Sequence, residues 1–552
     1  MKHRFSSQNR NKMLEEMTKE QYDVFVIGGG ITGAGIAFDA ASRGMKIALA
    51  EMQDFAAGTS SRSTKLVHGG LRYLKQFEVK MVAEVGKERA VVYENGPHVT
   101  TPEWMLLPIH KGGTFGKFST SVGLRVYDFL AGVKSSERRK MLNSKETLVK
   151  EPLLKKSGLK GGGYYVEYRT DDARLTIEVM KEAVKFGADA VNYAKVTDFI
   201  YENGKVIGVK VLDIMTNKTY DVYAKKIVNA TGPWVDELRE KDNSRKGKHL
   251  QLTKGIHLVF DQSKFPLKQA VYFDTPDGRM VFAIPRNGKT YVGTTDTVYK
   301  EDARHPRMAK KDREYVLEAV HFMFPDLKIT EKDVESSWAG LRPLIHEEGK
   351  DPSEISRKDE IWTSNSGLIT IAGGKLTGYR KMAEHIVDLL VNIINKETGK
   401  DFGSCKTKNM PISGGHVGGS EGFPQFFNKK VEEGKDIGLP EDQAKILVQR
   451  YGSNIDIVYG RLENLKQQAE VLNAPVHLLA QIDYAIQEEM AATPVDFFVR
   501  RTGAVYFDIE WAKKWKDLVI HYMAKELSWS QEQREQLSEE LNKHLFDAVV
   551  PV

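Results

Sequence analysis

The sequence predicts an α/β protein with an inserted, mostly antiparallel β region and a separate helical C-terminal domain. Three observations support this prediction. A strand, a glycine-rich turn, a helix and a second strand follow one another over residues 23–51. Apolar strands separated by glycine-containing turns recur over residues 250–340. After residue 400 a glycine-rich stretch leads into residues 438–552, which follow a helical pattern almost throughout.

Length and composition limit the class of protein. The 552 residues are too many for one core, so two or three domains are expected. Apolar residues make up 41% and charged residues 28%, as in globular proteins. The net charge is +6, from 81 basic and 75 acidic residues. This excess is too small to indicate nucleic acid binding but is compatible with an anionic substrate or a lipid surface.

The sequence also excludes several kinds of site. Cys405 is the only cysteine, which excludes a disulfide framework, a Cys-x-x-Cys redox pair and a cysteine zinc site. No His, Asp and Glu cluster has ligand spacing, so no metal is expected. Residues 1–20 are polar, without the apolar core of a signal peptide, and should form a short capping helix or a loose tail. No run approaches the roughly 18 apolar residues that cross a bilayer, so we expect a cytosolic protein or one on the cytosolic face of a membrane.

The first strand–turn–helix unit has the pattern of a dinucleotide-binding fold. Strands are predicted over residues 24–27 and 45–50, and a helix over residues 36–42. Between them, Gly28, Gly30 and Gly33 have the G-x-G-x-x-G spacing that allows a sharp turn, close approach of a pyrophosphate and close helix packing. The helix N-terminus then offers N–H groups to the phosphates. Glu51 ends the second strand, where its carboxylate can accept a hydrogen bond from a ribose hydroxyl. The motif alone does not distinguish NAD from FAD.

Small residues and then basic residues follow this unit. Residues 56–61 are Ala-Ala-Gly-Thr-Ser-Ser, which suits a backbone packed against a cofactor. The basic residues that follow are Arg62, Lys65, His68, Arg72 and Lys75. They form either a solvated helix face or part of a site. A nucleotide unit precedes these residues, and Gly69 and Gly70 lie among the charges. These two features make a site as well supported as a solvated helix face.

The middle of the chain is predicted less sharply. Residues 79–160 look mainly helical, and the basic, amphipathic segment 115–140 either packs on the domain or lies on an anionic membrane surface. A helix is predicted over residues 175–186, with Asp171 and Asp172 placed to cap it. Hairpin strands around Asn203-Gly204 precede a buried strand over residues 226–230.

Two later regions complete the α/β pattern. The strands of the β region are predicted over residues 255–260, 270–273, 280–284 and 290–293. A second strand–glycine–helix unit covers residues 367–380, with Lys375 and Arg380 beside the glycines.

Taken together, the motifs resemble a known family. VIGGGITGAG, TSSRSTKLVHGGLRYL, VNATGPWV, GTTDT, AGLRPL and AGGKLTGYR occur in this order. They are similar to the FAD-dependent, aerobic glycerol-3-phosphate dehydrogenases of respiring bacteria, the Bacillus type in particular, over essentially the whole chain. The resemblance implies a Rossmann-like FAD domain of the glutathione reductase and D-amino-acid oxidase type. After a tail over residues 1–20, its FAD-binding parts would be residues 21–78, 161–250 and 338–400, its substrate-domain parts residues 79–160 and 251–337, and its helical C-terminal domain residues 401–552.

The resemblance also implies a reaction and a cofactor site. The C2 hydroxyl of sn-glycerol 3-phosphate would be oxidised to the ketone of dihydroxyacetone phosphate, and a membrane quinone would reoxidise the non-covalently bound FAD. The cofactor-binding residues that it implies are Gly28, Gly30, Gly33, Glu51, Thr59, Ser60, Ser61, Thr64, Lys65, His68, Gly69, Gly70, Gly232, Gly374, Leu376 and Thr377.

The substrate residues follow from the same resemblance and fit the chemistry. Arg72, Tyr73, Arg357 and Lys375 match the family's phosphate-binding positions, and a dianionic phosphate needs convergent cations. His257 and Arg342 are the matching candidates for the hydride-transfer step. Histidine has a suitable pKa for accepting the hydroxyl proton, whereas arginine suits orienting the hydroxyl and stabilising the developing alkoxide. His257 could equally be a core histidine, so the proton acceptor stays open.

Two alternative functions are compatible with the sequence. The first is an FAD oxidase that acts on glycerol 3-phosphate, an amino acid or a hydroxy acid and uses oxygen. The second is a non-enzymatic flavoprotein that binds a partner through its helical tail. Peripheral membrane association is expected, and the oligomeric state, including a homodimer, is open.

Overall fold

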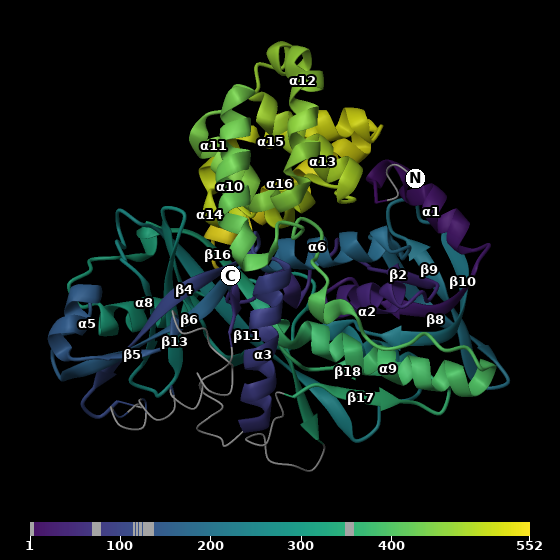
Figure 1. The fold of residues 1–552 in the computed structure, drawn as a ribbon, viewed down its shortest axis with the longest axis horizontal. Coiled ribbons are helices and arrows are strands. Elements are labelled where there is room, and N and C mark those ends of the chain that lie inside the picture. Colours follow the sequence, from purple (N-terminus) through teal and green to yellow (C-terminus); the bar gives the residue numbers. More distant parts are fainter. Residues whose placement is uncertain are drawn as a thin grey trace.

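A computed structural model describes residues 5–68, 79–113, 116, 120, 124, 137–347 and 358–552. Two regions that each contain a sheet lie side by side, and the helices of the C-terminal part stand above them (Figure 1). The α/β fold with an added helical domain is therefore confirmed.

The first sheet is mostly parallel and contains the predicted dinucleotide unit. The strand order is β17-β18-β10-β1-β2-β7, and the hairpin strands β8 and β9 join through β10. Its strands are β1 (Gln21–Ile27), β2 (Ile47–Ala50), β7 (Asp189–Val191), β8 (Ala194–Glu202), β9 (Lys205–Asp213), β10 (Thr219–Asn229), β17 (Glu360–Thr363) and β18 (Ile369–Ala372). Strands β1, β2, β7, β10 and β18 pair in parallel, so the loops that follow β1, β10 and β18 meet at one edge.

Three helices pack together beside this sheet. They are α2 (Ile31–Ser42), α6 (Asp172–Lys185) and α9 (Tyr379–Thr398), and α2 contacts both of the others (Figure 1). Helix α2 begins directly after Gly30, five residues before the predicted start at Ile36. The glycines in ITGAG favour a turn locally, but Ala34, Ile36 and Ala37 are completely buried and stabilise the longer helix.

The second sheet is larger and almost wholly antiparallel. Its path is β15-β11-β14-β13-β12-β4-β6-β3, with β16 paired to β11 and β5 paired to β6. Its strands are β3 (Leu66–Val67), β4 (Thr100–His110), β5 (Lys140–Leu142), β6 (Leu159–Thr170), β11 (Lys248–Asp261), β12 (Ala270–Asp274), β13 (Met280–Arg286), β14 (Lys289–Gly293), β15 (Thr297–Val298) and β16 (Val334–Glu347). The four predicted strands of the β region correspond to β11, β12, β13 and β14.

The prediction of a mainly helical stretch over residues 79–160 is wrong for much of its length. Helix α3 (Val79–Asn95) and helix α5 (Ser144–Lys150) are present, but β4 and most of β6 form a long antiparallel pair. The cause lies in residues 105–109, which are all buried. A strand that is buried on both faces shows neither the period of a helix nor that of a half-exposed strand. Most of segment 115–140 lies outside the described residues.

Helices make up most of the C-terminal part, as predicted. They are α10 (Gly419–Asp436), α11 (Glu441–Tyr451), α12 (Ile455–Val471), α13 (Val476–Glu488), a π-helix (Asp496–Arg501), α14 (Ala504–Phe507), α15 (Ile509–Glu526) and α16 (Gln531–Val549). The remaining helices are α1 (Arg10–Met17), α7 (Val235–Lys241), α8 (Lys310–Met323) and single 3₁₀ turns. Of the two alternatives for the N-terminus, the short helix is found, because Arg10 pairs with the buried Asp213 at 2.6 Å.

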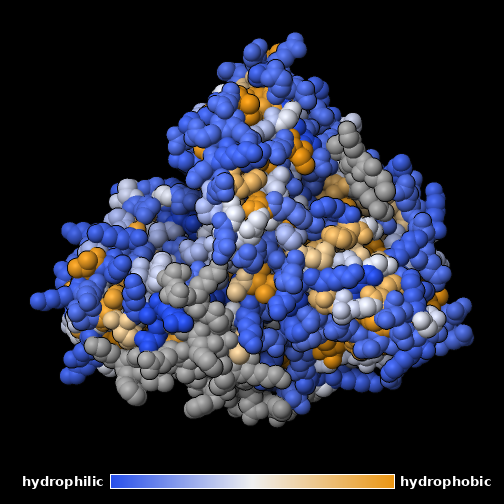
Figure 2. All heavy atoms as spheres, viewed as in Figure 1, coloured by the Kyte–Doolittle hydropathy of each residue, from blue (hydrophilic) through white to orange (hydrophobic). Residues whose placement is uncertain are grey.

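Continuous cores hold these parts together. One cluster of buried side chains surrounds the first sheet, and another joins Val259, Tyr291 and Trp338 of the second sheet to Phe497 and Phe498 of the C-terminal helices. On the face in Figure 2, hydrophobic side chains appear as small groups separated by hydrophilic ones. Across the described parts of the chain, every helix is too short or too polar to span a bilayer.

Candidate active site

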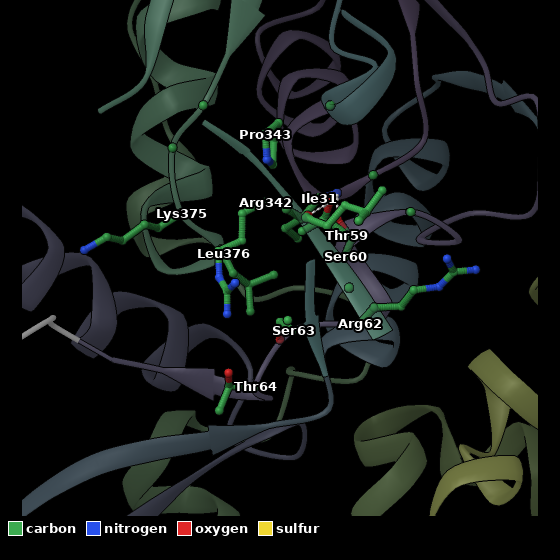
Figure 3. Close-up of a pocket in the computed structure, with 18 of the residues that line it drawn as sticks. Ile31, Thr59, Ser60, Arg62, Ser63, Thr64, Arg342, Pro343, Lys375 and Leu376 are labelled. Carbon is green, nitrogen blue, oxygen red and sulfur yellow. Dashed lines mark hydrogen bonds between the residues drawn. The ribbon is translucent and has the colours of Figure 1, made fainter. Parts of the chain in front are cut away.

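A cavity of about 550 Å³ lies where the loops of the first sheet face the second sheet. The turn after β1, the residue after β2, segment 58–64, residues 230–234 after β10 and residues 371–377 form one side. Side chains of β6, β11, β12, β13 and β16 form the other (Figure 3). Parallel strands therefore place their carboxyl ends around a ligand-sized space, which is the usual position of a binding site in such sheets.

Close backbone contacts require glycine at two positions of the first turn, and the third glycine has little room for a side chain. Gly28 has a φ of +110°, and a Cβ there would lie 2.6 Å from the carbonyl oxygen of Ala230. A Cβ on Gly33 would lie 1.9 Å from the carbonyl oxygen of Gly28, so Gly33 allows α2 to pack onto the turn rather than lining the cavity. A Cβ on Gly30 would point at Ser60 Oγ, 3.1 Å away. The backbone of the turn can therefore approach a ligand as the motif requires.

Glu51 is held in place at the end of β2. Its carboxylate accepts hydrogen bonds from the N–H of Gly29 at 2.6 Å and the N–H of Gln53 at 2.8 Å, and it lines the cavity. Burial raises the pKa of Glu51, and these two hydrogen bonds oppose that shift. The carboxylate is thus fixed beside the glycine turn, where a ribose hydroxyl of a dinucleotide would lie.

Segment 59–65 runs along the cavity and is anchored behind it. Asp172 accepts from Ser63 Oγ at 2.7 Å and from Lys65 Nζ at 2.6 Å. Asp171 caps helix α6 by accepting from the N–H of Arg174, and Asp172 also accepts from the first-turn N–H of Ala173 at 2.9 Å. Capping was predicted for both carboxylates, but the further role of Asp172 as the anchor of this segment was not. Lys65 and Ser61 are buried behind the wall of the cavity and do not line it.

His257 occupies the wall opposite the glycine turn. It stands in one row of the sheet between Gly293 of β14 and Trp338 of β16. Its ring stacks on Trp338, with centroids 4.6 Å apart and planes 11° apart, and its Nε2 lies 3.1 Å from Thr64 Oγ1. Burial, and then the charges of Arg342 and Lys65, lower the pKa of His257 well below its ordinary value. The imidazole is therefore neutral at pH 7.

Arg342 lies near His257 in a fixed orientation. Its Nη1 donates to the Thr295 carbonyl and to Asp296, both at 3.2 Å, and its Nη2 donates to Thr294 Oγ1 at 3.0 Å. A Cβ on Gly255 would lie 2.5 Å from Nη2, so a side chain at this position would displace the guanidinium. Figure 3 shows the guanidinium directed into the space above Ser63 and Thr64. A positive charge thus faces the same space as the neutral imidazole.

Residues after β18 close the other end of the cavity. Thr377 Oγ1 accepts from the His68 N–H at 3.1 Å and donates to the His68 carbonyl at 3.2 Å, which joins the two segments. Burial, with the charges of Lys375 and Arg89, lowers the pKa of His68 to about 3. Lys375 lines the cavity, but in Figure 3 its side chain extends away from Arg342.

Most of the described candidates line this one cavity. They are Gly28, Gly30, Glu51, Thr59, Ser60, Thr64, His68, Gly232, Gly374, Leu376 and Thr377, with His257, Arg342 and Lys375. Gly69, Gly70, Arg72, Tyr73 and Arg357 lie outside the described residues, so the meeting of four cations around a phosphate stays a prediction. No group of three or more possible metal ligands occurs within the described ranges.

The structure adds residues that the sequence did not indicate. Tyr272 and Phe282 stack at 4.2 Å and line the cavity together with Tyr165. Asp296 joins them through its contact with Arg342. Aromatic residues in alternating strands are as typical of a core as of a site, so no signal in the sequence would have identified them.

Comparisons with known proteins agree with this architecture. The family model "FAD dependent oxidoreductase" matches residues 23–380, and the model "C-terminal domain of alpha-glycerophosphate oxidase" matches residues 405–534. The chain is 73% identical over 552 residues, the whole of both chains, to the aerobic glycerol-3-phosphate dehydrogenase of Bacillus subtilis (strain 168). It is 61% identical over 547 residues, 98% of each chain, to the protein of the same name from Staphylococcus haemolyticus (strain JCSC1435).

Solved structures show the same similarity. The glycerol-3-phosphate dehydrogenase from Bacillus halodurans, complexed with FAD, has a TM-score of 0.87 and 52% identity over 99% of each chain. The L-alpha-glycerophosphate oxidase from Mycoplasma pneumoniae, with FAD bound, has a TM-score of 0.54 at 19% identity, over 67% of this chain and 95% of that one. The second likeness shows only a shared fold.

Proposed function

Because this chain belongs to the FAD-dependent oxidoreductases and, among them, to the aerobic glycerol-3-phosphate dehydrogenases, we propose that it oxidises sn-glycerol 3-phosphate to dihydroxyacetone phosphate and passes the electrons to a membrane quinone. The observation that carries this proposal is one cavity in which a dinucleotide cradle faces a neutral histidine and a fixed arginine. The resemblance of the motifs predicts the same reaction.

The residues present fit FAD. Gly28 and Gly374 have positive φ values, +110° and +82°, and lack side chains where backbone meets the cavity. Glu51 is fixed at the ribose position, and the N-terminal turn of α2 faces the cavity through Ile31 and Thr32. These groups would hold the ribose and the pyrophosphate. When bound, FAD supplies the acceptor for the hydride that leaves C2 of the substrate.

His257 is the proposed proton acceptor for the C2 hydroxyl. Its neutral ring carries a free electron pair at one nitrogen, and Nδ1 is buried without a hydrogen-bond partner among the described residues. A low pKa makes it a weak base. The substrate brings a dianionic phosphate, and nearby negative charge raises the pKa of a histidine, so binding would strengthen the base.

Arg342 would stabilise the oxygen from which that proton leaves. Negative charge develops there as the proton moves to His257 and the C2 hydrogen departs as hydride. A guanidinium held by three hydrogen bonds needs no reorientation to meet this charge. We propose that Arg72, Tyr73, Arg357 and Lys375 bind the phosphate, because planar and flexible cations together suit a dianion.

A steady-state assay tests the proposal. Purified protein reconstituted with FAD should convert sn-glycerol 3-phosphate to dihydroxyacetone phosphate with a short-chain quinone as acceptor, and glycerol should not replace the substrate. The absence of turnover with any quinone or dye, in protein that retains its flavin, would exclude the proposed activity.

Oxygen is the second candidate acceptor. The match of residues 405–534 to the C-terminal domain of alpha-glycerophosphate oxidase supports keeping it. Hydrogen peroxide released in air, in amounts equal to the ketone formed, would assign an oxidase. We propose peripheral docking on the membrane for the quinone reaction, which predicts that salt or detergent shifts the protein between membrane and soluble fractions.

A further inference from the structure

A second, much smaller cavity lies at the seam between the C-terminal helices and the second sheet. Its volume is about 30 Å³, and one water molecule needs about 10–15 Å³ on the same scale. Residues of α16, of the loop before α8 and of segment 59–64 meet there. The polar residues that line it are Arg62, His305, Arg307, Ser337, Tyr506, His544 and Asp547.

Arg62 is a buried cation without an acidic partner among the described residues. Only 9% of the residue is exposed, and both Nη atoms donate to the carbonyl oxygen of Arg304 at 3.2 Å. No carboxylate pairs with it within the described parts of the chain. In Figure 3 its side chain points away from Thr64 and Arg342, and it lines the seam cavity together with His544 and Asp547 of α16. Arg62 lines both cavities and therefore stands between the seam and the large cavity.

The charged groups around Arg62 add to this excess. Burial is the main cause that lowers the pKa of Arg62, and the charge of Arg500 lowers it further. Burial is the main cause that lowers the pKa values of His305 and His544, and the charge of Arg62 lowers both further. Tyr506 and Tyr299 oppose the lowering of the Arg62 pKa only as phenolates, and their own pKa values are raised, so at pH 7 they carry no charge to pair with Arg62. A buried cation in such surroundings is costly unless an anion compensates it.

The one carboxylate of this cavity is already used. Asp547 accepts from Arg307 Nη2 at 2.7 Å through one oxygen and lies 2.8 Å from His305 Nε2 through the other. Arg307 Nε is buried and has no hydrogen-bond partner among the residues described. The ring of His544 stands edge-on to that of His305 at 4.5 Å. Donors therefore exceed acceptors around the cavity.

We propose that this seam cavity binds one tetrahedral inorganic oxyanion of the phosphate and sulfate class, with Arg62 as its main ligand and Arg307 and His544 beside it. A planar guanidinium presents paired N–H groups at the spacing of two oxyanion oxygens. Arg62 stands between Ser61 and Ser63, in the segment that lines the cofactor cavity. The bound anion would therefore join the C-terminal helices to the cofactor-binding segment.

A crystal structure of the FAD-loaded protein grown in selenate tests the site directly. Selenate mimics sulfate and gives an anomalous signal at the selenium edge. We expect a peak within hydrogen-bond distance of Arg62 that persists when glycerol 3-phosphate, too large for this cavity, is added in excess. A selenate in the active site would be displaced by that addition. Water alone, or a halide in a matched bromide soak, at the position of the expected peak would overturn the assignment.

Thermal unfolding of the FAD-loaded protein gives a second test in solution. Sulfate titrated against chloride at equal ionic strength should raise the midpoint in a saturable way. Arg307→Gln should weaken the apparent sulfate affinity at least tenfold. Arg304→Gln is the matched control, because it removes the same charge from an exposed side chain that pairs with Asp302, and its sulfate affinity should equal that of the natural chain.

Arg62→Gln distinguishes an anion ligand from a purely structural arginine. Without oxyanion, removing an uncompensated buried charge should leave the midpoint unchanged or raise it, and sulfate should then have no saturable effect. If Arg62→Gln lowers the midpoint in chloride, and the natural chain shows no saturable response to sulfate, Arg62 serves only to hold the Arg304 carbonyl and the proposal is wrong.

Discussion

Substituting Gly293 should disable His257 without altering it. The His257 ring lies between Gly293 and Trp338 in one row of the sheet, and a Cβ at Gly293 would lie 2.3 Å from His257 Cδ2. Ordinary contact begins at 3.4 Å, so in Gly293→Ala the ring must move by about 1 Å. Trp338, stacked at 4.6 Å and 3% exposed, blocks movement toward β16.

The expected effect separates stability from catalysis. Moving the ring by about 1 Å lengthens its 3.1 Å contact with Thr64 beyond hydrogen-bond range. Overpacking of this kind costs about 1–3 kcal/mol in the free energy of unfolding. The loss of a positioned base lowers the rate by roughly 10²–10⁴-fold. We therefore expect a modest fall in the unfolding midpoint and a fall of about 100-fold or more in kcat.

Rapid anaerobic mixing with glycerol 3-phosphate, followed at the flavin absorbance maximum, measures this rate. FAD content should match that of the natural chain, because Gly293 does not contact the dinucleotide cradle. Gly460→Ala, at a helix position with no atom within 4 Å of the new Cβ, is the control for alanine substitution. On a His257→Ala background the Gly293 change should have little further effect on the rate. Flavin reduction by Gly293→Ala within threefold of the natural rate would refute the role of His257.

Three further predictions concern the side chains of Arg342, Arg501 and His98. Arg342→Lys should lower kcat about 10²-fold with flavin retained, because an ammonium cannot make the three fixed hydrogen bonds; unchanged kcat would remove Arg342 from the reaction. Arg501→Gln should weaken FAD binding about tenfold, measured by fluorescence titration of the flavin-free protein, because Arg501 holds the buried Asp54 in the loop that follows Glu51. Arg461→Gln breaks a pair with Asp483 within the C-terminal helices and should destabilise the fold while leaving FAD affinity unchanged, so equal loss of affinity in both would contradict the idea. Burial lowers the pKa of His98 to about 3, so the unfolded chain binds this proton at a higher pH than the folded chain, and the free energy of unfolding falls as pH drops from about 6.5 toward 3. Neither ring nitrogen of His98 has a hydrogen-bond partner among the described residues, so His98→Leu should reduce the dependence of the unfolding midpoint on pH in that window. An unchanged slope of midpoint against pH would contradict this.

Local patterns predicted the elements whose sequence and environment agree. The first strand, its glycine turn and the strands around Asn203-Gly204 and Asn287-Gly288 depend on short-range steric effects, which sequence expresses directly. The start of α2 and the whole of β4 were not predicted, because burial decides them. Ile31 begins a helix among glycines, and β4 carries an apolar run with two prolines, so tertiary packing overrides the local preference in both cases.

The candidate site was predicted only as far as family motifs reach. His257 and Arg342 were assigned by resemblance, and the structure places both on the cavity that the glycine turn lines. Their surroundings could not be read from the sequence, because Thr64 and His257 are 193 positions apart and Asp172 holds a segment 107 positions away. The positions of Arg62 and Lys65 also could not be predicted. These basic residues are three positions apart, but Arg62 lines the seam cavity and Lys65 pairs with the buried Asp172.

The most direct measurement of the central claim is the reduction of bound flavin by glycerol 3-phosphate that carries deuterium at C2, under anaerobic conditions. If C2 delivers a hydride across this cavity, flavin absorbance should fall in a single turnover, and deuterium should slow that fall severalfold. Flavin that stays oxidised with saturating substrate, in protein that binds FAD fully, would contradict the account.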